Sequence, residues 1–583
     1  MPLGLKMTLP DGYEFGARMR DYGYHPQGKA IHDWFATFIN LAAEVATGSG
    51  PWVSEARDLL ARHFRTLWSF AGMADVLESV SERLIDSGWE RGWLAIRQTI
   101  QFDKKSLRAE ALQRLKKLEE LARPKTLVAR VKATVLANYA AGLDYADGED
   151  DVSGYELAEV RARELGELVA NDPAAFDVLL PLLVTNQQGR HWSFGRGLAD
   201  AVESLSACWA EMTKAFEDTP DEQRNVQVLR GFLHATHCRD RSTFESCLDE
   251  AMGRAALAPW VPVLQLSAPL DESGCSRLLA SMDNPAVTAW AFQHLAIGRA
   301  TEHLSDDLLA GLLQKLSIKP DGLSVAIDVL YMHIHGNDHP IGPCVTAVAH
   351  TLIANASLVN HRGRLDHELS GVIKKFLCGT EGESTVRILL SKLRQKFEDH
   401  ALSRYDLTET IAALFKVQPH LALDALVGDE DDSDNRYMRR YELAGGRSSS
   451  ALTEISIDAL MDWCRAGSPQ RWTRVASLLP AFAVAESGQT PKWSERVMTL
   501  LQNSPDPVAV GAELVELVEP SGWSGSRAEA IRQRLPLLDQ LTDVLGPENA
   551  NAVASWRSRV MLTIDRETRR ELEEHKARNE RFE

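Results

Sequence analysis

The stretch WVSEARDLLARHFRTLWSF, residues 52–70, decides how the fold is read. Its apolar side chains return every three or four residues, and charged side chains lie mainly between them. The apolar set is Trp52, Val53, Leu59, Leu60, Phe64, Leu67 and Trp68. Because an α-helix turns once in 3.6 residues, side chains spaced in this way share one face. The stretch therefore predicts an amphipathic helix with its apolar face in a core.

The same spacing recurs along the chain, and helix-breaking residues separate the periodic segments. Further periodic segments are 107–121, 308–316 and 325–332. Proline or a glycine-containing turn follows each of them within a few residues. Short helices with short connections form antiparallel hairpins, and hairpins in series stack into a solenoid. We predict an all-α chain, an irregular HEAT/TPR-like helical-hairpin solenoid with little or no sheet, although no strict repeat period is found.

With 583 residues, the chain exceeds the roughly 250–300 residues at which single cores stop growing. Two acidic stretches that contain glycine, 144–155 and 429–450, interrupt the helical rhythm and mark predicted boundaries. The predicted plan is an N-terminal segment 1–50, a helical-hairpin domain 51–143, an acidic linker 144–155, an α-solenoid 156–428, an acidic and serine-rich loop 429–450, and a C-terminal helical domain 451–583.

Charge and cysteine content restrict the class of protein. The formal net charge is −18, which repels phosphate backbones over most of the surface and suits protein partners. The seven cysteines are scattered without a framework spacing, as is usual for reduced thiols in a cytosol. No signal peptide and no run of about 18 apolar residues is visible, so we expect a cytoplasmic protein that does not enter a membrane.

One candidate metal site combines His234, His237, Cys238 and Cys247. The two histidines are three residues apart on a predicted helix and share a face, and two thiols could complete a tetrahedral zinc site. The spacing matches no standard zinc pattern. The competing interpretation, which we prefer, is a helix end with partly buried cysteines.

A second candidate is the histidine-rich stretch that contains His333, His335 and His339. A His-x-His pair suits a metal when it lies on a strand, where both rings face one side. Here the pair follows a helical segment, and positions i and i+2 of a helix diverge by about 200°. We therefore favour a helix C-terminus, where histidine suits the dipole.

Motifs for phosphate binding and for hydrolysis are absent. No Walker-type loop, G-x-S-x-G elbow or H-E-x-x-H sequence occurs, so we expect no cofactor and no enzyme activity. The glycine-containing stretch Gly189–Gly197 includes the bulky pair His191-Trp192 and follows no predicted strand. We interpret it as the start of a helix in which Gly195 and Gly197 permit close contact with neighbouring helices. A metal-dependent hydrolase or nuclease remains the alternative.

Clusters of basic residues keep a third class, a nucleic-acid-binding protein, under consideration. The cations that could form a local groove are Lys104, Lys105, Lys116, Lys117, Arg123, Lys125, Arg436, Arg439 and Arg440. Charges of this kind more often lie on solvated helix faces, and the acidic net charge disfavours nucleic acid as the main ligand.

Several segments resemble the helical C-terminal region of large bacterial defence proteins of the STAND class, including AVAST-type anti-phage sensors. They lie between about residues 50 and 350 and are Trp89–Ile100, Leu121–Leu127, Phe194–Leu198, Arg224–Leu233 and Gly322–Met332. In those proteins a nucleotide-binding module and an effector precede a long α-solenoid. The resembling segments are packing and turn signatures, so no functional residue is transferred.

The resemblance implies target recognition or assembly rather than catalysis. Because the NTPase and effector parts are missing from this sequence, we expect either a fragment or a separate subunit that works with another protein. Our leading hypothesis is a protein-binding α-solenoid that acts as a sensor or scaffold in a bacterial anti-phage defence complex. Its partner would be a separate NTPase or effector subunit or a phage protein.

Overall fold

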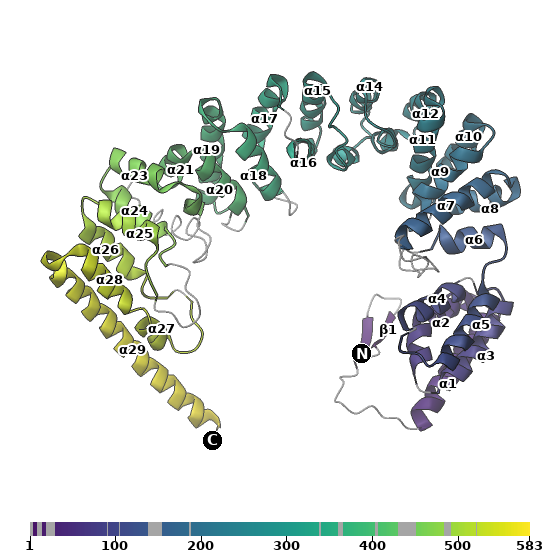
Figure 1. Ribbon diagram of the computed structural model, residues 1–583, viewed down its shortest axis with the longest axis horizontal. Coiled ribbons are helices and arrows are strands. Elements are labelled where there is room, and N and C mark those ends of the chain that lie inside the picture. Colours follow the sequence, from purple (N-terminus) through teal and green to yellow (C-terminus); the bar gives the residue numbers. More distant parts are fainter. Residues whose placement is uncertain are drawn as a thin grey trace. The chain divides into compact units, whose positions relative to one another are not determined.

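A computed structural model describes most of the chain (Figure 1). The described residues are 4–8, 14–18, 29–70, 72–89, 91–103, 105–137, 154–185, 188–336, 340–359, 365–402, 406–428, 451–482, 491–520 and 522–582. They form two compact units, Met1–Ala268 and Pro269–Glu583. The boundary between the units lies inside the segment 156–428, which the sequence analysis assigned to one solenoid.

The first unit contains one antiparallel β-hairpin, β1 (Gly4–Thr8) and β2 (Glu14–Arg18), in which Leu5 pairs with Ala17. Helices follow it. They are α1 (Lys29–Thr47), α2 (Val53–Ser69), α3 (Ala74–Asp86), α4 (Gly92–Asp103), α5 (Ala109–Ala122), α6 (Leu127–Thr134), α7 (Gly154–Ala170), α8 (Pro173–Leu183), α9 (His191–Ala201), α10 (Leu205–Glu217), α11 (Gln227–Arg239), α12 (Arg241–Gly253) and α13 (Val261–Gln265), with the 3-10 helices η2 (Asp221–Gln223) and η3 (Ala258–Trp260).

Helices of the first unit pack on their second neighbour along the chain, which sorts them into two rows. Helix α1 packs on α3 and α3 on α5, while α2 packs on α4. Further along, α7, α9, α11 and α13 form one row, and α6, α8, α10 and α12 form the other. Apolar side chains such as Phe64, Phe194 and Phe232 fill the space between rows and are fully buried. This is the arrangement expected of stacked helical hairpins.

Apart from their connections and one isolated β-bridge between Phe482 and Trp493, the described residues of the second unit form helices. They are α14 (Glu272–Ser281), η4 (Ala289–Ala296), α15 (Asp306–Ser317), α16 (Gly322–Ile334), α17 (Pro343–Asn355), α18 (Leu365–Phe376), η5 (Thr380–Gly382), α19 (Glu383–Glu398), α20 (Thr408–Val417), α21 (Pro419–Leu426), η6 (Ala451–Glu454), α23 (Ile457–Ala466), α24 (Gln470–Leu478), α25 (Glu495–Asn503), α26 (Pro507–Glu516), α27 (Arg527–Arg532), α28 (Pro536–Leu545), η7 (Pro547–Asn549) and α29 (Ala550–Phe582).

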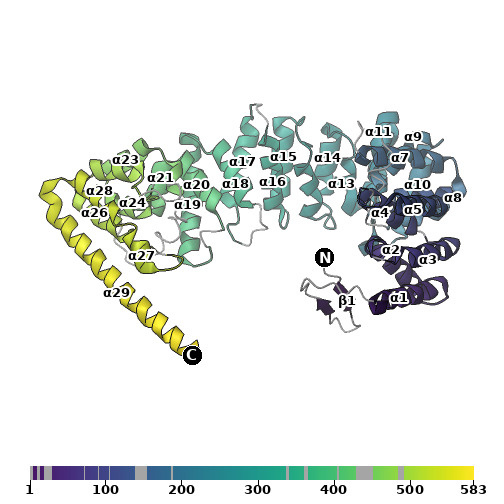
Figure 2. The same cartoon turned by 60° about the horizontal axis from the view of Figure 1, so that its bottom comes forward.

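The second unit repeats the two-row pattern. One row runs through α15, α17, α19 and α21, and the other through η4, α16, α18 and α20 (Figures 1 and 2). Helix α24 packs on α26, and α26 on α28, in the same manner. The predicted all-α, helical-hairpin fold is confirmed. The predicted helices over 52–70, 107–121, 308–316 and 325–332 correspond to α2, α5, α15 and α16.

A carboxylate at the start of one helix caps the next helix of its row at two places. Both oxygens of Asp306 on α15 accept backbone N–H groups of α17, from Cys344 at 2.8 Å and Val345 at 3.1 Å. Asp366 on α18 accepts from the first turn of α20 at 2.9 and 2.8 Å. The first amides of a helix lack partners within the helix, and a carboxylate also suits its dipole. These caps therefore fix the offset between successive helices.

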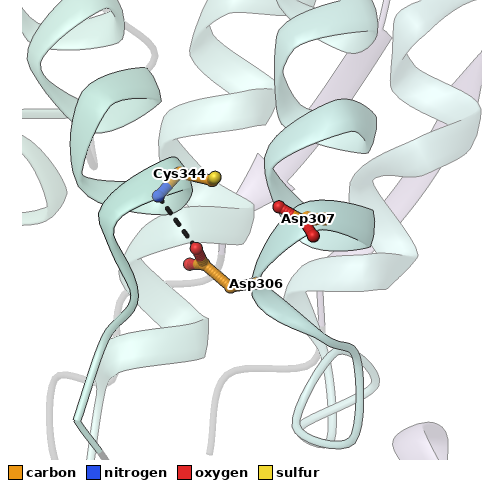
Figure 3. Close-up of side chains that lie close together, drawn as sticks. All are labelled: Asp306, Asp307 and Cys344. Carbon is orange, nitrogen blue, oxygen red and sulfur yellow. Dashed lines mark hydrogen bonds between the residues drawn. The ribbon is translucent and has the colours of Figure 1, made fainter.

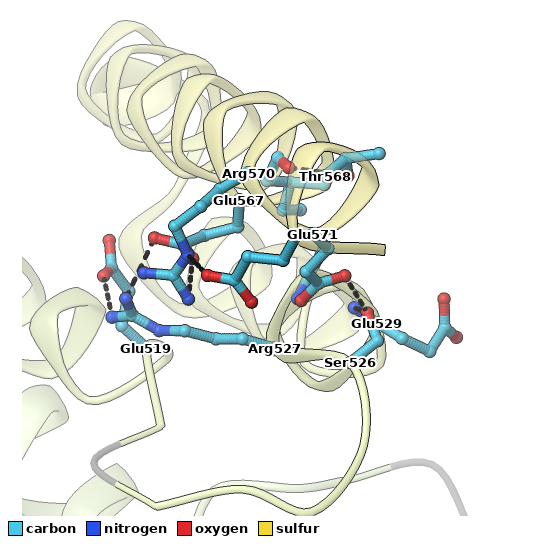
Figure 4. Close-up of polar contacts among 11 residues, drawn as sticks. Glu519, Ser526, Arg527, Glu529, Glu567, Thr568, Arg570 and Glu571 are labelled. Carbon is cyan, nitrogen blue, oxygen red and sulfur yellow. Dashed lines mark hydrogen bonds and ion pairs between the residues drawn. The ribbon is translucent and has the colours of Figure 1, made fainter. Parts of the chain in front are cut away.

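The long helix α29 is anchored along only part of its length. Glu567, with 4% of its surface exposed, forms ion pairs with Arg527 at 3.0 Å and Arg570 at 2.8 Å (Figure 4). Glu571 accepts hydrogen bonds from the Ser526 hydroxyl and the Ala528 amide at the start of α27. The described side chains of α29 beyond residue 571 are exposed. Helix α29 begins at Ala550 and lies within the predicted C-terminal helical domain 451–583.

The structure differs from three of the predicted segment boundaries or leaves them undescribed. The linker predicted for 144–155 overlaps α7, which begins at Gly154, and residues 144–153 lie outside the described residues. The loop predicted for 429–450 lies wholly outside them. Helix α1, placed by the sequence in a separate segment 1–50, packs on α2 and α3. Among the described helices, none combines the length and apolar character that crossing a membrane requires.

Candidate functional site

The residues of the first predicted metal site make separate contacts. His234 Nδ1 lies 2.8 Å from the carbonyl oxygen of Ser267, and the His237 ring meets Phe244 edge-on at 5.0 Å. Cys238 is exposed on α11, whereas Cys247 is buried on α12. Burial raises the pKa of the Cys247 thiol to about 12. A protonated thiol among apolar neighbours fits the preferred interpretation of a packed helix end.

The second histidine group is also divided among different partners. His333 lies in the last turn of α16 and its Nδ1 is 3.1 Å from the Thr301 hydroxyl, with burial lowering its pKa. His335 is the C-cap of the same helix. His339 lies outside the described residues. The expected helix C-terminus is confirmed at this place.

Two of the five described cations of the predicted basic groove lie beside carboxylates. Arg123 forms ion pairs at 3.1 Å with both Glu119 and Glu120, and Lys117 lies 4.0 Å from Glu82. The remaining described cations of this set are exposed; they are Lys105, Lys116 and Lys125. Outside the described residues lie Lys104, Arg436, Arg439 and Arg440.

One group of potential metal ligands exists among the described residues, and the sequence analysis missed it. It consists of Asp306, Asp307 and Cys344, whose ligand atoms lie within 4.8 Å of one another (Figure 3). The Asp306 carboxylate already caps α17. A hydrogen bond to Asp307 and the nearby negative charges raise the pKa of the Cys344 thiol to about 11. The group is thus explained as a helix cap with a protonated thiol beside it.

A chain of hydrogen bonds links three helices of the second unit. The Tyr331 hydroxyl on α16 lies 2.8 Å from His367 Nε2 on α18, and His367 Nδ1 lies 2.9 Å from Glu409 Oε2 on α20. His335 Nδ1 lies 3.3 Å from the same hydroxyl. In such an arrangement the carboxylate orients the imidazole, and the imidazole can take a proton from the hydroxyl. Tyr331 is only 8% exposed, and both imidazoles contact its hydroxyl. This series of hydrogen bonds is therefore best explained as a link between helices.

Glycines bring α7, α9 and α11 into contact at the level of their backbones. A Cβ atom at Gly197 would lie 1.9 Å from the Arg163 carbonyl oxygen of α7, and one at Gly195 would lie 2.2 Å from the Val228 carbonyl oxygen of α11. Gly231 faces Trp192 in the same way, at 2.0 Å. Helix α9 begins at His191, as predicted, and the predicted close helix contacts at Gly195 and Gly197 are confirmed.

This close approach assembles a patch of four side chains across α9 and α11, which we call the α9–α11 patch: Trp192, Arg196, Arg230 and His234. The Arg230 guanidinium lies over the Trp192 ring, 5.2 Å from its centroid, and the His234 ring centroid is also 5.2 Å from that of Trp192. Arg196 is one turn from Trp192 on the same face of α9. All four side chains are partly exposed.

The electrostatics of the α9–α11 patch are unusual for this chain. Burial lowers the pKa of Arg230, which donates a hydrogen bond to Gln227 Oε1 at 3.2 Å. Arg196 has a buried Nε atom without a hydrogen-bond partner. Among the described residues, no carboxylate forms an ion pair with either arginine, whereas Arg163 on the neighbouring helix pairs with Asp200 at 2.7 Å. The patch can therefore accept an anionic group next to an aromatic ring.

From the sequence, His234 was considered only as a metal ligand, and the patch was not predicted. The helical spacing of Trp192 with Arg196 and of Arg230 with His234 was a usable signal, since positions four apart share a face. The register between α9 and α11 depends on the glycine contacts and could not be read from spacing alone.

Comparisons with known proteins add little to this geometry. No protein-family model matches the sequence, and no curated protein matches it. Among solved structures, one similar chain is described as a "Circular tandem repeat protein with novel repeat topology and enhanced subunit contact surfaces". The match has 12% sequence identity and a TM-score of 0.14, and covers 94% of this chain and 99% of the other. At that TM-score the likeness supports no conclusion about function.

Proposed function

We propose that the protein is a non-catalytic scaffold that binds a protein partner, and that the α9–α11 patch receives an acidic segment of that partner. The observation that carries the proposal is the pair Arg196 and Arg230, which lie partly buried beside Trp192 without a carboxylate in the described structure. Tryptophan and arginine are enriched among the residues that dominate binding energy at protein interfaces. A carboxylate from a partner would supply the counter-charge that the described residues do not.

A protein partner suits the charges of this chain better than a nucleic acid does. The net charge of −18 opposes a long phosphate backbone, and the two arginines of the patch offer only a small cationic area. An acidic peptide segment needs only such a local area. It can place one or two carboxylates on the arginines, where charge-assisted hydrogen bonds are stronger than neutral ones.

Within this function, we propose the role of sensor or scaffold subunit in a bacterial anti-phage defence complex. Support comes from the segments that resemble STAND-class defence proteins. Two of them, Phe194–Leu198 and Arg224–Leu233, supply the glycines Gly195, Gly197 and Gly231 of the close helix contacts. The partner would be a separate NTPase or effector subunit, or a phage protein.

The test is affinity capture of the tagged full chain from its bacterial host, before and after phage infection, with stoichiometry measured by mass spectrometry. We expect one partner in near-equimolar amount that is recovered with the wild-type chain and lost with Arg230→Glu. As a matched control, Arg465→Glu reverses an exposed arginine on α23 in the other unit and should retain the partner. Recovery of the bait alone under both conditions would contradict the proposal.

A further inference from the structure

The outer face of α1 carries exposed apolar side chains in a regular line. Trp34 is 54% exposed, Leu41 is 59% exposed and Val45 is 39% exposed. Phe38 is partly exposed between them, and its ring stacks on that of Trp34 with a centroid distance of 6.1 Å and an interplanar angle of 11°. We call Trp34, Phe38, Leu41 and Val45 the α1 seam.

The spacing of the α1 seam is that of a helix which packs on another helix. The intervals of four, three and four residues place Trp34 and Leu41 at d positions and Phe38 and Val45 at a positions of a heptad. The face that α1 turns towards α2 and α3 is a different line, one residue further along, with Ile39, Ala42, Ala43 and Ala46 buried. Of the seam residues, Phe38 also packs partly against this core, whereas Trp34, Leu41 and Val45 are not part of it.

The extent of the α1 seam makes its exposure unexpected. Helix α1 packs on α2 and α3, and the seam adds four apolar side chains beside the buried line. A contiguous apolar patch of this kind at the surface has the property of an interface.

A second copy of this chain is the occupant that the seam fits best. In an antiparallel pairing of two α1 helices, a positions face d positions, so Trp34 of one copy meets Val45 of the other and Phe38 meets Leu41. Each large aromatic side chain then faces a smaller aliphatic one, whereas a parallel pairing would oppose Trp34 to itself. The antiparallel arrangement also aligns the helix dipoles favourably. The contact is isologous and closes after two copies.

We propose that the protein forms a homodimer through antiparallel packing of two α1 seams. The exposed parts of the four side chains in both copies amount to on the order of 600 Å² of apolar surface, with the aromatic residues as the largest contributors. Interfaces below about 1,200 Å² belong to weak and reversible assemblies. The dimer therefore dissociates on dilution. The proposal is independent of the α9–α11 patch and of the partner bound there.

Sedimentation velocity of the full chain over a concentration series tests the proposal. We expect the wild-type chain to approach twice its mass of 64.6 kDa at about 50 μM and to dissociate at about 0.5 μM, as a weak interface predicts. Leu41→Glu should remain monomeric throughout. The matched control Leu562→Glu, at a leucine of α29 that is 70% exposed, should dimerise like the wild type. Because both leucines are exposed in the monomer, neither substitution should change the melting temperature.

Hydroxyl-radical footprinting of the same samples separates a second copy from the other possible occupant, the β1–β2 hairpin of the same chain. We expect Trp34 to be oxidised rapidly at low concentration and to be protected at high concentration. Protection that does not depend on concentration would assign the seam to the hairpin and overturn the proposal. A wild-type chain that stays monomeric at the highest concentration, or a Leu41→Glu chain that still dimerises, would also overturn it.

Discussion

The glycine contacts between α9 and α11 yield a prediction with a definite sign. In Gly231→Ala the new Cβ atom would lie 2.0 Å from the carbonyl oxygen, 2.7 Å from the carbonyl carbon and 2.9 Å from the Cα atom of Trp192. All three neighbours are backbone atoms, so no side-chain rotation relieves the contact. Helices α9 and α11 must move apart by about 1 Å, which loosens the interdigitated side chains along both of them.

The magnitude follows from two opposing effects. Overpacking of a close-packed interior costs up to about 3 kcal/mol, and here the backbone contacts favour the upper end of that range. Alanine is the better helix former by about 1 kcal/mol. We therefore expect Gly231→Ala to lower the free energy of unfolding of this region by about 2 kcal/mol.

The matched control is Gly311→Ala on α15, where a Cβ atom meets nothing within 4 Å. There the substitution changes only the helix propensity, and it should stabilise the protein by about 1 kcal/mol. The assay is native-state hydrogen exchange read by mass spectrometry, because a chain of two units need not unfold in one step. Exchange in α9 and α11 should become about 30-fold faster in Gly231→Ala. If Gly231→Ala stabilised the protein as Gly311→Ala does, the close backbone contact would be refuted.

Two further perturbations test other contacts. Burial lowers the pKa of His191 to about 4, below its ordinary value of 6.5, so the folded state holds the neutral ring while the unfolded state takes up a proton. Stability is complete above pH 6.5 and declines as the pH falls towards 4. By pH 5 the free energy of unfolding is lower by about 2 kcal/mol. Urea denaturation at a series of pH values should show that this free energy depends less steeply on pH in His191→Gln than in the wild type. The cap on α20 predicts that Asp366→Ala lowers the free energy of unfolding by about 1–2 kcal/mol, because the amides of Glu409 and Thr410 lose their acceptors. Asp366→Asn, which keeps one oxygen, should lose about half of that amount in the same denaturation assay, and equal losses would argue against the cap.

Helical periodicity was sufficient to predict the class of fold, and short-range patterns were sufficient for several helices. Residues 52–70 and 308–316 show apolar spacing that only one helical face satisfies, and they form α2 and α15. Gly195 and Gly197 could be interpreted correctly because two glycines at i and i+2 of a helix face opposite neighbours. The β1–β2 hairpin was not predicted, although Leu5 and Met7 alternate with Lys6 and Thr8, because strands of five residues give only a short alternating pattern.

Contacts between distant helices explain why the sites were harder to predict than the helices. Asp306 and Cys344 are far apart in the sequence, and nothing in the local pattern shows that the Asp306 carboxylate caps α17. The same holds for Tyr331, His367 and Glu409, which come together only because α16, α18 and α20 stack in register. His234 was noticed for its neighbours in sequence, although its functional interest comes from Trp192 on another helix.

The central claim is that the chain binds a protein partner through the α9–α11 patch, and the most direct measurement is the affinity of the captured partner for three forms of the full chain. Isothermal titration calorimetry would compare the wild type with Arg230→Glu and with the control Arg465→Glu. We expect Arg230→Glu to weaken binding at least about tenfold, as loss of an interface hot spot does, while the control binds like the wild type. Equal affinity of all three forms would contradict the assignment of the patch as the binding site.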